Sequence, residues 1–313
     1  MLSRNYGLGT RDMKSAGRAA MNLLCQKKGA SFTTVDAVST RWNRFVHYSK
    51  ARGVGRMERV TPDLVIEYGC EIARLVREEL MTAGYAQVLV SAVNTVMCAA
   101  TRNTWRSVAP VKDCQIPQRT AIRTTAPTAV DPANFDAVLP FIQQAVGERG
   151  VAVALLAREL GLRAEEASLI NPRKVLSEAI KTGSARIVNG TKGGRQRLIE
   201  ITSERQLTAL RFASAVQGKD RSLVPSDKNY VQWLNSGLRK IRETLAAHGL
   251  VGLHELRASY ACQRYFNLTG CNAPCLGAKI IDRAADRAAR LVISSELGHR
   301  RIDVTSEYIG ARK

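Results

Sequence analysis

Four short segments of the sequence carry side chains that could act together on one substrate. The last segment contains His299 and Tyr308, nine residues apart. A tyrosine hydroxyl can act as a nucleophile, and a histidine can accept or donate its proton. Upstream of them, in chain order, stand Gly161-Leu162-Arg163-Ala164-Glu165-Glu166, Thr191-Lys192-Gly193-Gly194-Arg195 and His254-Glu255-Leu256-Arg257. Arginine, lysine, histidine and tyrosine are together the parts of a phosphoryl-transfer site.

Each of these residues also has an ordinary structural explanation. Gly298 suits the C-cap of a helix, Tyr308 could be a packed aromatic residue, and a lysine in a turn, such as Lys192, is usually solvated surface. The His-x-x-Arg match of His254 and Arg257 arises easily by chance in a sequence so rich in arginine. The functional interpretation therefore depends on the whole set and on its order.

The second half of the sequence predicts the elements that would position this set. A helix over residues 151–160 ends at Gly161 and another begins beyond it, so Arg163 lies beside a helix N-terminus, which favours an anion. Glu166 follows three residues later on the same face and can orient the guanidinium. Alternating residues over 185–189 and 197–202 predict a β-hairpin with Lys192 near its tip. Helices are expected from 131 to 146, from 203 to about 216, over 230–241 and over 254–266.

The first part of the sequence predicts a helical domain followed by a linker. Residues 1–104 are predicted to be helical, with apolar residues at helical spacing over 38–49 and 88–96 and with a cap at Thr61 followed by proline at N1. Prolines, threonines and arginines over 105–130 predict an extended basic linker. We expect a mainly α fold with a small β-hairpin or sheet (α+β), in which 1–115 is one domain, 116–130 a linker and 131–313 the second domain.

Composition narrows the class of partner. Lys and Arg number 47 against 27 acidic residues, a formal charge of +20. Repulsion within such a large positive charge destabilises the folded chain unless an anionic partner offsets it. Nucleic acid is the first candidate for this partner and an anionic membrane the second. The longest apolar stretch, 86–100, is interrupted by polar residues, so we expect no membrane span. The basic residues predicted to face DNA are Arg41, Arg44, Lys50, Arg52 and Arg195.

The cysteine and histidine spacing does not favour a metal. The seven cysteines are irregularly spaced, and Cys271 and Cys275 have no second pair nearby. Structural zinc sites need four closely arranged ligands, so we predict no metal and no other cofactor. No secretory signal opens the sequence, and free thiols in a reducing cytoplasm are expected.

In combination, the four segments resemble the tyrosine recombinase (phage integrase) family, whose members carry Arg, Lys, His-x-x-Arg, His and a nucleophilic Tyr in that order. The matching residues are Arg163, Lys192, His254, Arg257, His299 and Tyr308, in the contexts GLRAEEASL, TKGGRQRLIEI, HELRASYA and LGHRRIDVTSEYI. The resemblance covers the second domain as a catalytic domain. The first domain is similar, more loosely, to the helical (SAM-like) core DNA-binding domain of the family.

The resemblance implies a role for each residue. Tyr308 would attack the scissile phosphate and form a 3′-phosphotyrosyl intermediate. Arg163, Arg257 and His299 would compensate the charge on the nonbridging oxygens without a metal. A free tyrosine ionises only near pH ~10, so a proton acceptor is needed, for which His254 is the candidate. Lys192 would protonate the leaving 5′-oxygen, and no ATP is required because the phosphotyrosyl bond keeps the energy.

Two departures from the family pattern concern the end of the sequence. His299 follows Arg257 by 42 positions (299 − 257), which is more than the family leads us to expect. The surplus lies around 269–290 and predicts a helical elaboration packed on the catalytic domain or on a neighbouring protomer, with a passive surface loop as the alternative. Five residues follow Tyr308 (313 − 308), too few for the helix that often docks on a neighbouring protomer.

The sequence thus predicts an integrase or resolvase of a mobile element, acting on double-stranded DNA in a prokaryotic or phage cytoplasm. It would work as a homotetramer on two DNA sites, with an accessory directionality factor as a further partner. Two alternatives stay open. One is a nicking-closing enzyme like the type IB topoisomerases, which shares this chemistry, and the other is a catalytically silent DNA-binding regulator.

Overall fold

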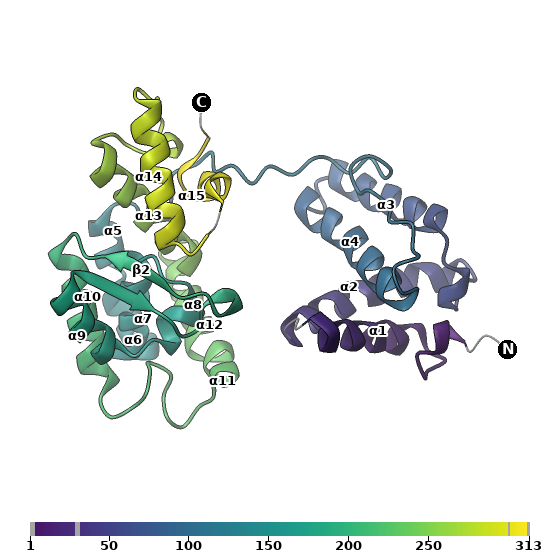
Figure 1. The fold of residues 1–313 in the computed structure, drawn as a ribbon, viewed down its shortest axis with the longest axis horizontal. Helices are drawn as coiled ribbons and strands as arrows, with labels where there is room; N and C mark the ends of the chain where they lie inside the picture. The colour runs from purple at the N-terminus through teal and green to yellow at the C-terminus, as the bar shows by residue number, and fades with distance from the viewer. Residues whose placement is uncertain (1–3, 29–31, 300, 312–313) are drawn as a thin grey trace. The chain divides into compact units, whose positions relative to one another are not determined.

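The computed structural model describes residues 4–28, 32–299 and 301–311. The chain divides into two compact units, Met1–Thr120 and Ala121–Lys313, which Figure 1 draws in purple to blue and in blue-green to yellow. The predicted mainly helical fold with one small sheet is confirmed, since β-structure among the described residues is limited to one antiparallel pair of strands.

The first unit is helical. Its described residues form α1 (Met13–Lys28), α2 (Phe32–Ala51), α3 (Pro62–Arg77) and α4 (Ala83–Ala100), with short 3-10 turns η1 (Asn5–Gly7) and η2 (Met57–Arg59). Thr61 caps α3 by accepting from the Leu64 amide, with Pro62 at N1. Helices α1, α2 and α4 pack on one another. Trp42 fills the contact between α1 and α2, where a Cβ on Gly17 would fall 2.1 Å from the indole nitrogen.

Helix α4 is the one described helix that is long and apolar enough to cross a membrane. Leu89, Val90, Val93, Val96 and Met97 on this helix are buried in the core of the first unit. Its apolar residues are therefore accounted for by packing against the neighbouring helices.

The stretch predicted as a linker is irregular, but much of it is packed. Val108, Cys114 and Ile116 are buried in the core of the first unit. Further along, Ala129 is buried in the core of the second unit. The basic and proline-rich composition predicted an extended segment, and it did not show that buried apolar residues anchor both ends of it.

The second unit is built around one buried helix. Helix α7 (Glu148–Glu159) packs against five neighbours, α6 (Leu139–Val146), α8 (Ala164–Leu169), α10 (Glu204–Gln217), α12 (Gly237–Ala247) and α13 (Leu253–Thr269). The remaining elements are α5 (Pro132–Asp136), α9 (Pro172–Thr182), α11 (Tyr230–Asn235), η4 (Pro274–Leu276), α14 (Arg283–Glu296), η5 (Ile302–Thr305) and α15 (Ser306–Ile309). In Figure 1, α7 lies behind the sheet and among the other helices.

The sheet pairs β1 (Ser184–Ile187) with β2 (Arg197–Glu200) antiparallel, so that Ile187 lies opposite Arg197. Both strands are shorter than the predicted runs. The loop between them contains η3 (Lys192–Gly194), as the hairpin prediction requires. On β2 the buried residues are Arg197 and Ile199, which alternate with exposed ones.

Two predicted helices are each broken in two. The helix expected over 131–146 divides into α5 and α6, because Pro140 lacks an amide hydrogen and cannot lie in the interior of a helix. The helix expected over 230–241 divides at Ser236, between α11 and α12. There the ring of Trp233 packs over Gly237, where a Cβ would lie 2.1 Å from a ring carbon.

The stretch around 269–290 that accounts for the surplus folds as helix only in part, since 270–282 form a connection with the 3-10 turn η4 (Pro274–Leu276) and 283–290 belong to α14. Helix α13 continues to Thr269, and Gly270 ends it in the left-handed conformation (φ 69°). Helix α14 follows η4 and packs on α13, β2 and η5. The expected helical elaboration packed on the second unit is therefore met by α14, whereas 270–282 are a mainly irregular connection.

Candidate active site

The site begins at the turn between α7 and α8. Gly161 has φ +61°, and a Cβ there would fall 2.4 Å from the ring of Tyr260, so only glycine fits this turn without rearrangement. Arg163 is the N-cap residue of α8. Its amide and its Nη1 donate to the two carboxylate oxygens of Glu166, at 2.7 and 2.8 Å. The carboxylate thereby holds both the turn and the guanidinium, as predicted for Glu166.

Glu166 is completely buried and has a second arginine partner that the sequence analysis missed. Arg197, on β2, donates from Nη1 and Nη2 to the carboxylate at 2.7 Å each. Burial alone would raise the pKa of Glu166, but the hydrogen bonds and charge of Arg197, together with Arg163, lower the pKa to about 2. The carboxylate is therefore ionised throughout the physiological range.

Arg257, on α13, lies at the centre of the site and is 1% exposed. Its guanidinium donates to the carbonyl oxygens of Gly161 and Leu297 and lies 3.8 Å from the Glu166 carboxylate. The Leu297 carbonyl also accepts from Arg163 Nη2 at 3.3 Å. Burial lowers the pKa of Arg257 to about 10, which leaves the group charged at neutral pH.

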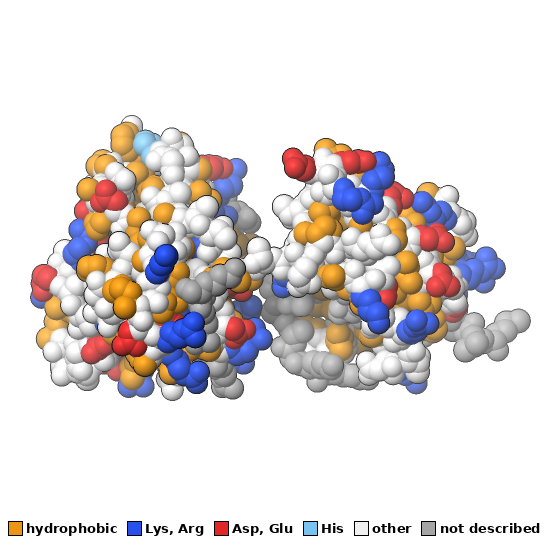
Figure 2. Space-filling view, turned by 90° about the horizontal axis from the view of Figure 1, so that it is seen from above, with side chains coloured by type: hydrophobic (Ala, Val, Ile, Leu, Met, Phe, Trp, Pro, Cys, Tyr) orange, Lys and Arg blue, Asp and Glu red, His pale blue; other side chains and the backbone are white. Residues whose placement is uncertain are grey.

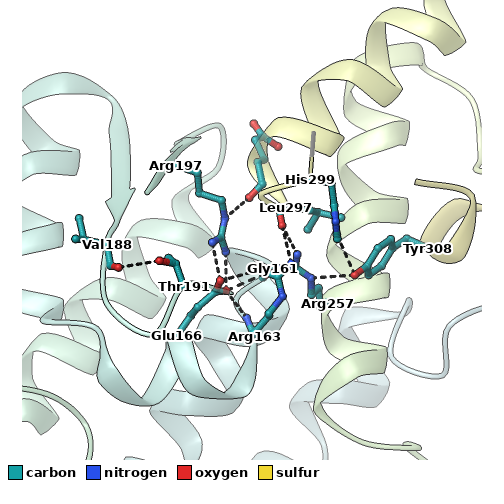
Figure 3. Close-up of polar contacts among 11 residues, drawn as sticks. Gly161, Arg163, Glu166, Val188, Thr191, Arg197, Arg257, Leu297, His299 and Tyr308 are labelled. Atoms are coloured by element: carbon teal, nitrogen blue, oxygen red, sulfur yellow. Dashed lines mark hydrogen bonds and ion pairs between the residues drawn. The ribbon is translucent and has the colours of Figure 1, made fainter. Parts of the chain in front are cut away.

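Tyr308 lies on α15 with its hydroxyl between two of the predicted partners (Figure 3). The hydroxyl oxygen is 3.4 Å from Arg257 Nε and 3.3 Å from His299 Nε2. The ring of His254 lies on another side, with 5.4 Å between ring centroids. The residue is 3% exposed, so packing holds its ring in place.

Both histidines are held in the neutral form by their surroundings. Burial and the positive charges of Arg257, Arg163, Arg197 and Lys192 lower the pKa of His299 to about 4. Burial and the charge of Arg257 also lower the pKa of His254. A neutral imidazole can accept a hydrogen bond from a tyrosine hydroxyl, although the lowered pKa makes each histidine a weaker base than a free imidazole.

The structure places Lys192 at the edge of this group. It is exposed on η3, in a loop where Gly193 and Gly194 have positive φ angles of 71° and 68°. The Thr191 hydroxyl fixes the start of the loop by donating to the Val188 carbonyl at 3.0 Å. Thus Arg163, His254, His299 and Tyr308 come together around Arg257, while Lys192 lies on the adjacent loop.

Arg197 is the site residue that sequence reasoning missed. Its Nε also donates to the Glu296 carbonyl at 2.6 Å, at the C-terminal end of α14 and close to His299. Arg197 therefore links β2, the strand after the Lys192 loop, by hydrogen bonds to α8 and to α14 (Figure 3). A signal was present in the sequence, because Arg197 falls on the same face of the alternating run as Ile199. A charged residue on a buried face needs a partner.

The basic residues predicted to contact DNA differ in their surroundings. On α2, Arg44 is exposed and Arg41 is half-buried. Lys50 pairs with Asp12 at 3.2 Å, and Arg52 pairs with Glu71 at 3.0 Å while its guanidinium lies 3.6 Å above the Tyr48 ring. Arg195 is exposed in the loop that carries Lys192. On the face that Figure 2 shows, Lys and Arg side chains occur on both units and lie among acidic ones.

No group of three or more His, Cys, Asp or Glu residues with metal-binding geometry occurs within residues 4–28, 32–299 and 301–311. Cys275 is buried and lies 3.5 Å from Cys262, measured between the sulfur atoms. The two thiols pack beneath the Tyr308 carbonyl, 3.7 Å from each.

Comparison with known proteins adds to this geometry. A family model described as integrase matches residues 118–263. No curated protein sequence matches the chain. Among solved structures, a lambda integrase dimer bound to a core site superposes with a TM-score of 0.58 at 13% identity, over 95% of this chain and 76% of that one. The XerH recombinase in a post-cleavage complex gives 0.56 at 15% identity, over 94% and 81%.

The Tn1549 transposon integrase in complex with circular-intermediate DNA gives a TM-score of 0.55 at 12% identity, covering 94% of this chain and 95% of that one. At such low identity these structures establish the shared fold, and the family model gives the match in sequence. The integrase family model over residues 118–263 and this common fold together support the tyrosine recombinase (phage integrase) family for this chain.

Proposed function

We propose that this tyrosine recombinase is an integrase or resolvase of a mobile element that cleaves and rejoins DNA through a 3′-phosphotyrosyl intermediate. The observation that carries the proposal is the position of the Tyr308 hydroxyl, within 3.4 Å of Arg257 Nε and 3.3 Å of His299 Nε2 of the same chain. A hydroxyl held between a cation and a neutral imidazole is suited to act as an activated nucleophile.

In the proposed reaction the Tyr308 oxygen attacks phosphorus as the bond to the 5′-oxygen breaks. Arg163 and Arg257 give up their contacts with the Leu297 carbonyl and donate to the nonbridging oxygens. Lys192, brought in by its loop, donates the proton to the leaving 5′-oxygen. The reverse attack by a 5′-hydroxyl restores the phosphodiester, so the cycle needs neither water nor ATP, and no metal step is required for charge compensation.

The distances favour a different division of labour between the histidines from that expected from the sequence. His299 is the imidazole within hydrogen-bond distance of the Tyr308 hydroxyl, so we propose it as the proton acceptor. His254 lies one turn before Arg257 on α13 and would instead donate to a nonbridging oxygen. The relative losses of rate in His299→Ala and His254→Ala distinguish the two assignments.

Assembly on DNA is also part of the proposal. One solved structure with this fold is a lambda integrase tetramer bound to a Holliday junction, with a TM-score of 0.57 at 13% identity. We propose that this chain likewise acts as a homotetramer on two duplex sites in the cytoplasm, where an accessory directionality factor would select the direction of reaction. The formal charge of +20 supports a nucleic-acid partner.

A plasmid assay tests the function. The DNA that flanks the coding sequence serves as the probe, because integrases usually lie beside their attachment site, and two copies are placed on one supercoiled plasmid. We expect the purified full chain to exchange the segment between the copies in buffer with EDTA. Relaxation without exchange would favour the topoisomerase-like alternative, and binding without strand cleavage would favour a silent regulator.

A further inference from the structure

The segment by which the chain enters the second unit is bonded to the helix that carries Tyr308. The Arg123 amide donates to the Ser306 carbonyl at 2.9 Å, and its Nε lies 3.4 Å from the Glu307 carbonyl. Beyond the tyrosine, a Cβ on Gly310 would fall 3.2 Å from the Arg123 carbonyl oxygen. Arg123 therefore bonds to the backbone just before Tyr308 and lies close to Gly310 just after it.

The same side chain is paired with the His-x-x-Arg segment. Both guanidinium Nη atoms of Arg123 donate to the two carboxylate oxygens of Glu255, and each side chain of this pair is 13% exposed. The Thr128 amide adds a third bond to that carboxylate at 3.2 Å. Glu255 stands directly after His254 and two residues before Arg257. A bidentate pair with so little solvent has a fixed geometry.

Helix α15 depends on such external contacts for its position. It has four residues, and a helix of one turn is not stable by itself. Its described neighbours are α13, η4 and η5, and Arg290 on α14 donates to the Gly310 and Ala311 carbonyls at 3.1 Å each. On the side before the tyrosine, Arg290 reaches the Thr305 and Ser306 hydroxyls at 3.4 Å each, and the Arg123 guanidinium bonds to the Glu307 carbonyl through Nε.

We infer that Arg123 is a positioning residue for the nucleophile, holding the Ser306–Tyr308 backbone against the His254–Arg257 segment through Glu255. This inference rests on the proposed role of Tyr308. It predicts that loss of the Arg123 side chain misplaces the tyrosine hydroxyl relative to Arg257 and His299, while the phosphate-binding groups stay where they are. The rate of covalent attack should then fall, with DNA affinity little changed.

The test compares Arg123→Ala with Arg119→Ala in the full chain. Arg119 is exposed four residues earlier, so its loss removes the same charge from the same segment without touching α15. The probe is a nicked duplex from the flanking DNA, and the covalent adduct is followed in single turnover at saturating protein. We expect Arg123→Ala to slow adduct formation about 10- to 100-fold, and Arg119→Ala to leave the rate unchanged. Both should leave DNA affinity little changed.

Two further variants separate positioning from loss of fold. Arg123→Lys keeps the positive charge but cannot make the bidentate contact of the guanidinium, so its rate should lie between those of Arg123→Ala and wild type. Glu255→Ala should resemble Arg123→Ala, and the double variant should be no slower than either single variant, because both remove one contact. For Arg123→Ala the rate should fall by the same factor across pH 6–9, since the guanidinium that is removed stays charged over this range.

The outcomes are distinct. Equal adduct rates for Arg123→Ala and wild type, or equal losses for Arg119→Ala and Arg123→Ala, would overturn the positioning role while leaving the proposed function intact. A fall in rate that is matched by a fall in thermal stability, with no recovery in Arg123→Lys, would also overturn it. A wild-type chain that forms no adduct on any flanking DNA would overturn the proposed function and this inference with it.

Discussion

Arg197 donates two hydrogen bonds of 2.7 Å to the buried carboxylate of Glu166, although the two residues come from different elements. Arg163 and Arg257 approach the same carboxylate at 2.8 and 3.8 Å. Three guanidinium groups thus share one carboxylate, which leaves an excess of two positive charges (3 − 1) at the place proposed for the phosphate. A concentrated positive field of this kind attracts an anion, and the carboxylate limits the repulsion between the arginines.

Glu166→Gln should therefore destabilise the second unit strongly. The neutral amide cannot offset the buried charges of Arg163 and Arg197, and removing one partner of a buried ion pair costs about 3–5 kcal/mol. Urea unfolding of the full chain measures the change. Glu165→Gln is the matched control, because Glu165 is the exposed neighbour and its change should stay within about 0.5 kcal/mol. Equal effects of the two variants would contradict the role assigned to the carboxylate.

The same carboxylate predicts how acid affects the protein. The pKa of Glu166 is about 2 in the folded chain, against 4.5 for the ordinary group, so the unfolded chain binds the proton more readily between these values. Stability from this group is complete above pH 4.5 and is lost as the pH falls towards 2. The shift of 2.5 units corresponds to about 3 kcal/mol. In thermal melts over pH 2–6, the wild-type chain should lose more stability towards low pH than Glu166→Gln does, because the variant lacks the carboxyl that takes up the proton.

The features that the sequence predicted well are the local ones. Thr61 and Ser203 cap helices through contacts three residues away, and the Arg163–Glu166 pair spans one helical turn. Arg197 was missed because its partners lie 31 and 99 residues away in the chain. The contact between Arg123 and Glu255 spans 132 residues. Such pairings depend on how elements assemble, which periodicity does not reveal.

The two histidines should differ in their effect on the pH profile. With a pKa of about 4, His299 is neutral from pH 5.5 to 7.5 and loses its capacity to accept a proton only as the pH falls through 4. We expect adduct formation to be nearly independent of pH over that interval. His299→Ala should lower the rate by about 10²- to 10⁴-fold, and His254→Ala by less. A rate that rises with a midpoint near ~6.5, the ordinary histidine value, would contradict this assignment, and a larger loss for His254→Ala would restore the role expected from the sequence.

Two basic residues, Arg44 on α2 and Arg52 just after it, should contribute unequally to DNA affinity. Arg44 is exposed, so Arg44→Ala should weaken binding on all sequences and reduce the slope of log K against log salt by about 1. Arg52 is already paired with Glu71 and stacked on Tyr48, so Arg52→Ala should change that slope less. Fluorescence anisotropy over a salt series, in a Tyr308→Phe background that prevents covalent attachment, measures both. Equal slopes for the two variants would show that the intramolecular pairing of Arg52 does not matter for binding.

Tyr308→Phe should abolish the covalent adduct and leave the fold and DNA affinity intact. The substitution removes the hydroxyl, which contacts Arg257 and His299, and keeps the ring, which is buried. Tyr85→Phe is a control, because Tyr85 is an exposed tyrosine of the first unit. Mass spectrometry of the trapped wild-type adduct should find the 3′-phosphate of DNA on Tyr308 and a free 5′-hydroxyl on the other fragment. Phosphate on another residue, or attachment to a 5′ end, would refute the assignment.

The role of Lys192 can be tested by the substrate that restores activity to Lys192→Ala. It is exposed on a loop with two glycines at positive φ, a place from which it can approach the leaving oxygen once DNA is bound. If it protonates the 5′-oxygen, Lys192→Ala should cleave ordinary DNA slowly but should regain activity on DNA with sulfur at the 5′-bridging position. A thiolate leaves without being protonated, since thiols ionise near pH ~8.5 whereas alcohols do not.

Arg163→Ala and Arg257→Ala provide the contrast, because these arginines are proposed to act on the nonbridging oxygens, which the sulfur substitution leaves unchanged. The sulfur substrate should therefore not restore their rates. Arg195→Ala is the control within the loop, since it removes a cation from the same exposed segment and should behave alike on both substrates. The measurement is the ratio of single-turnover rates on sulfur and oxygen substrates for each variant. A ratio for Lys192→Ala no larger than that for wild type would show that another group protonates the leaving oxygen.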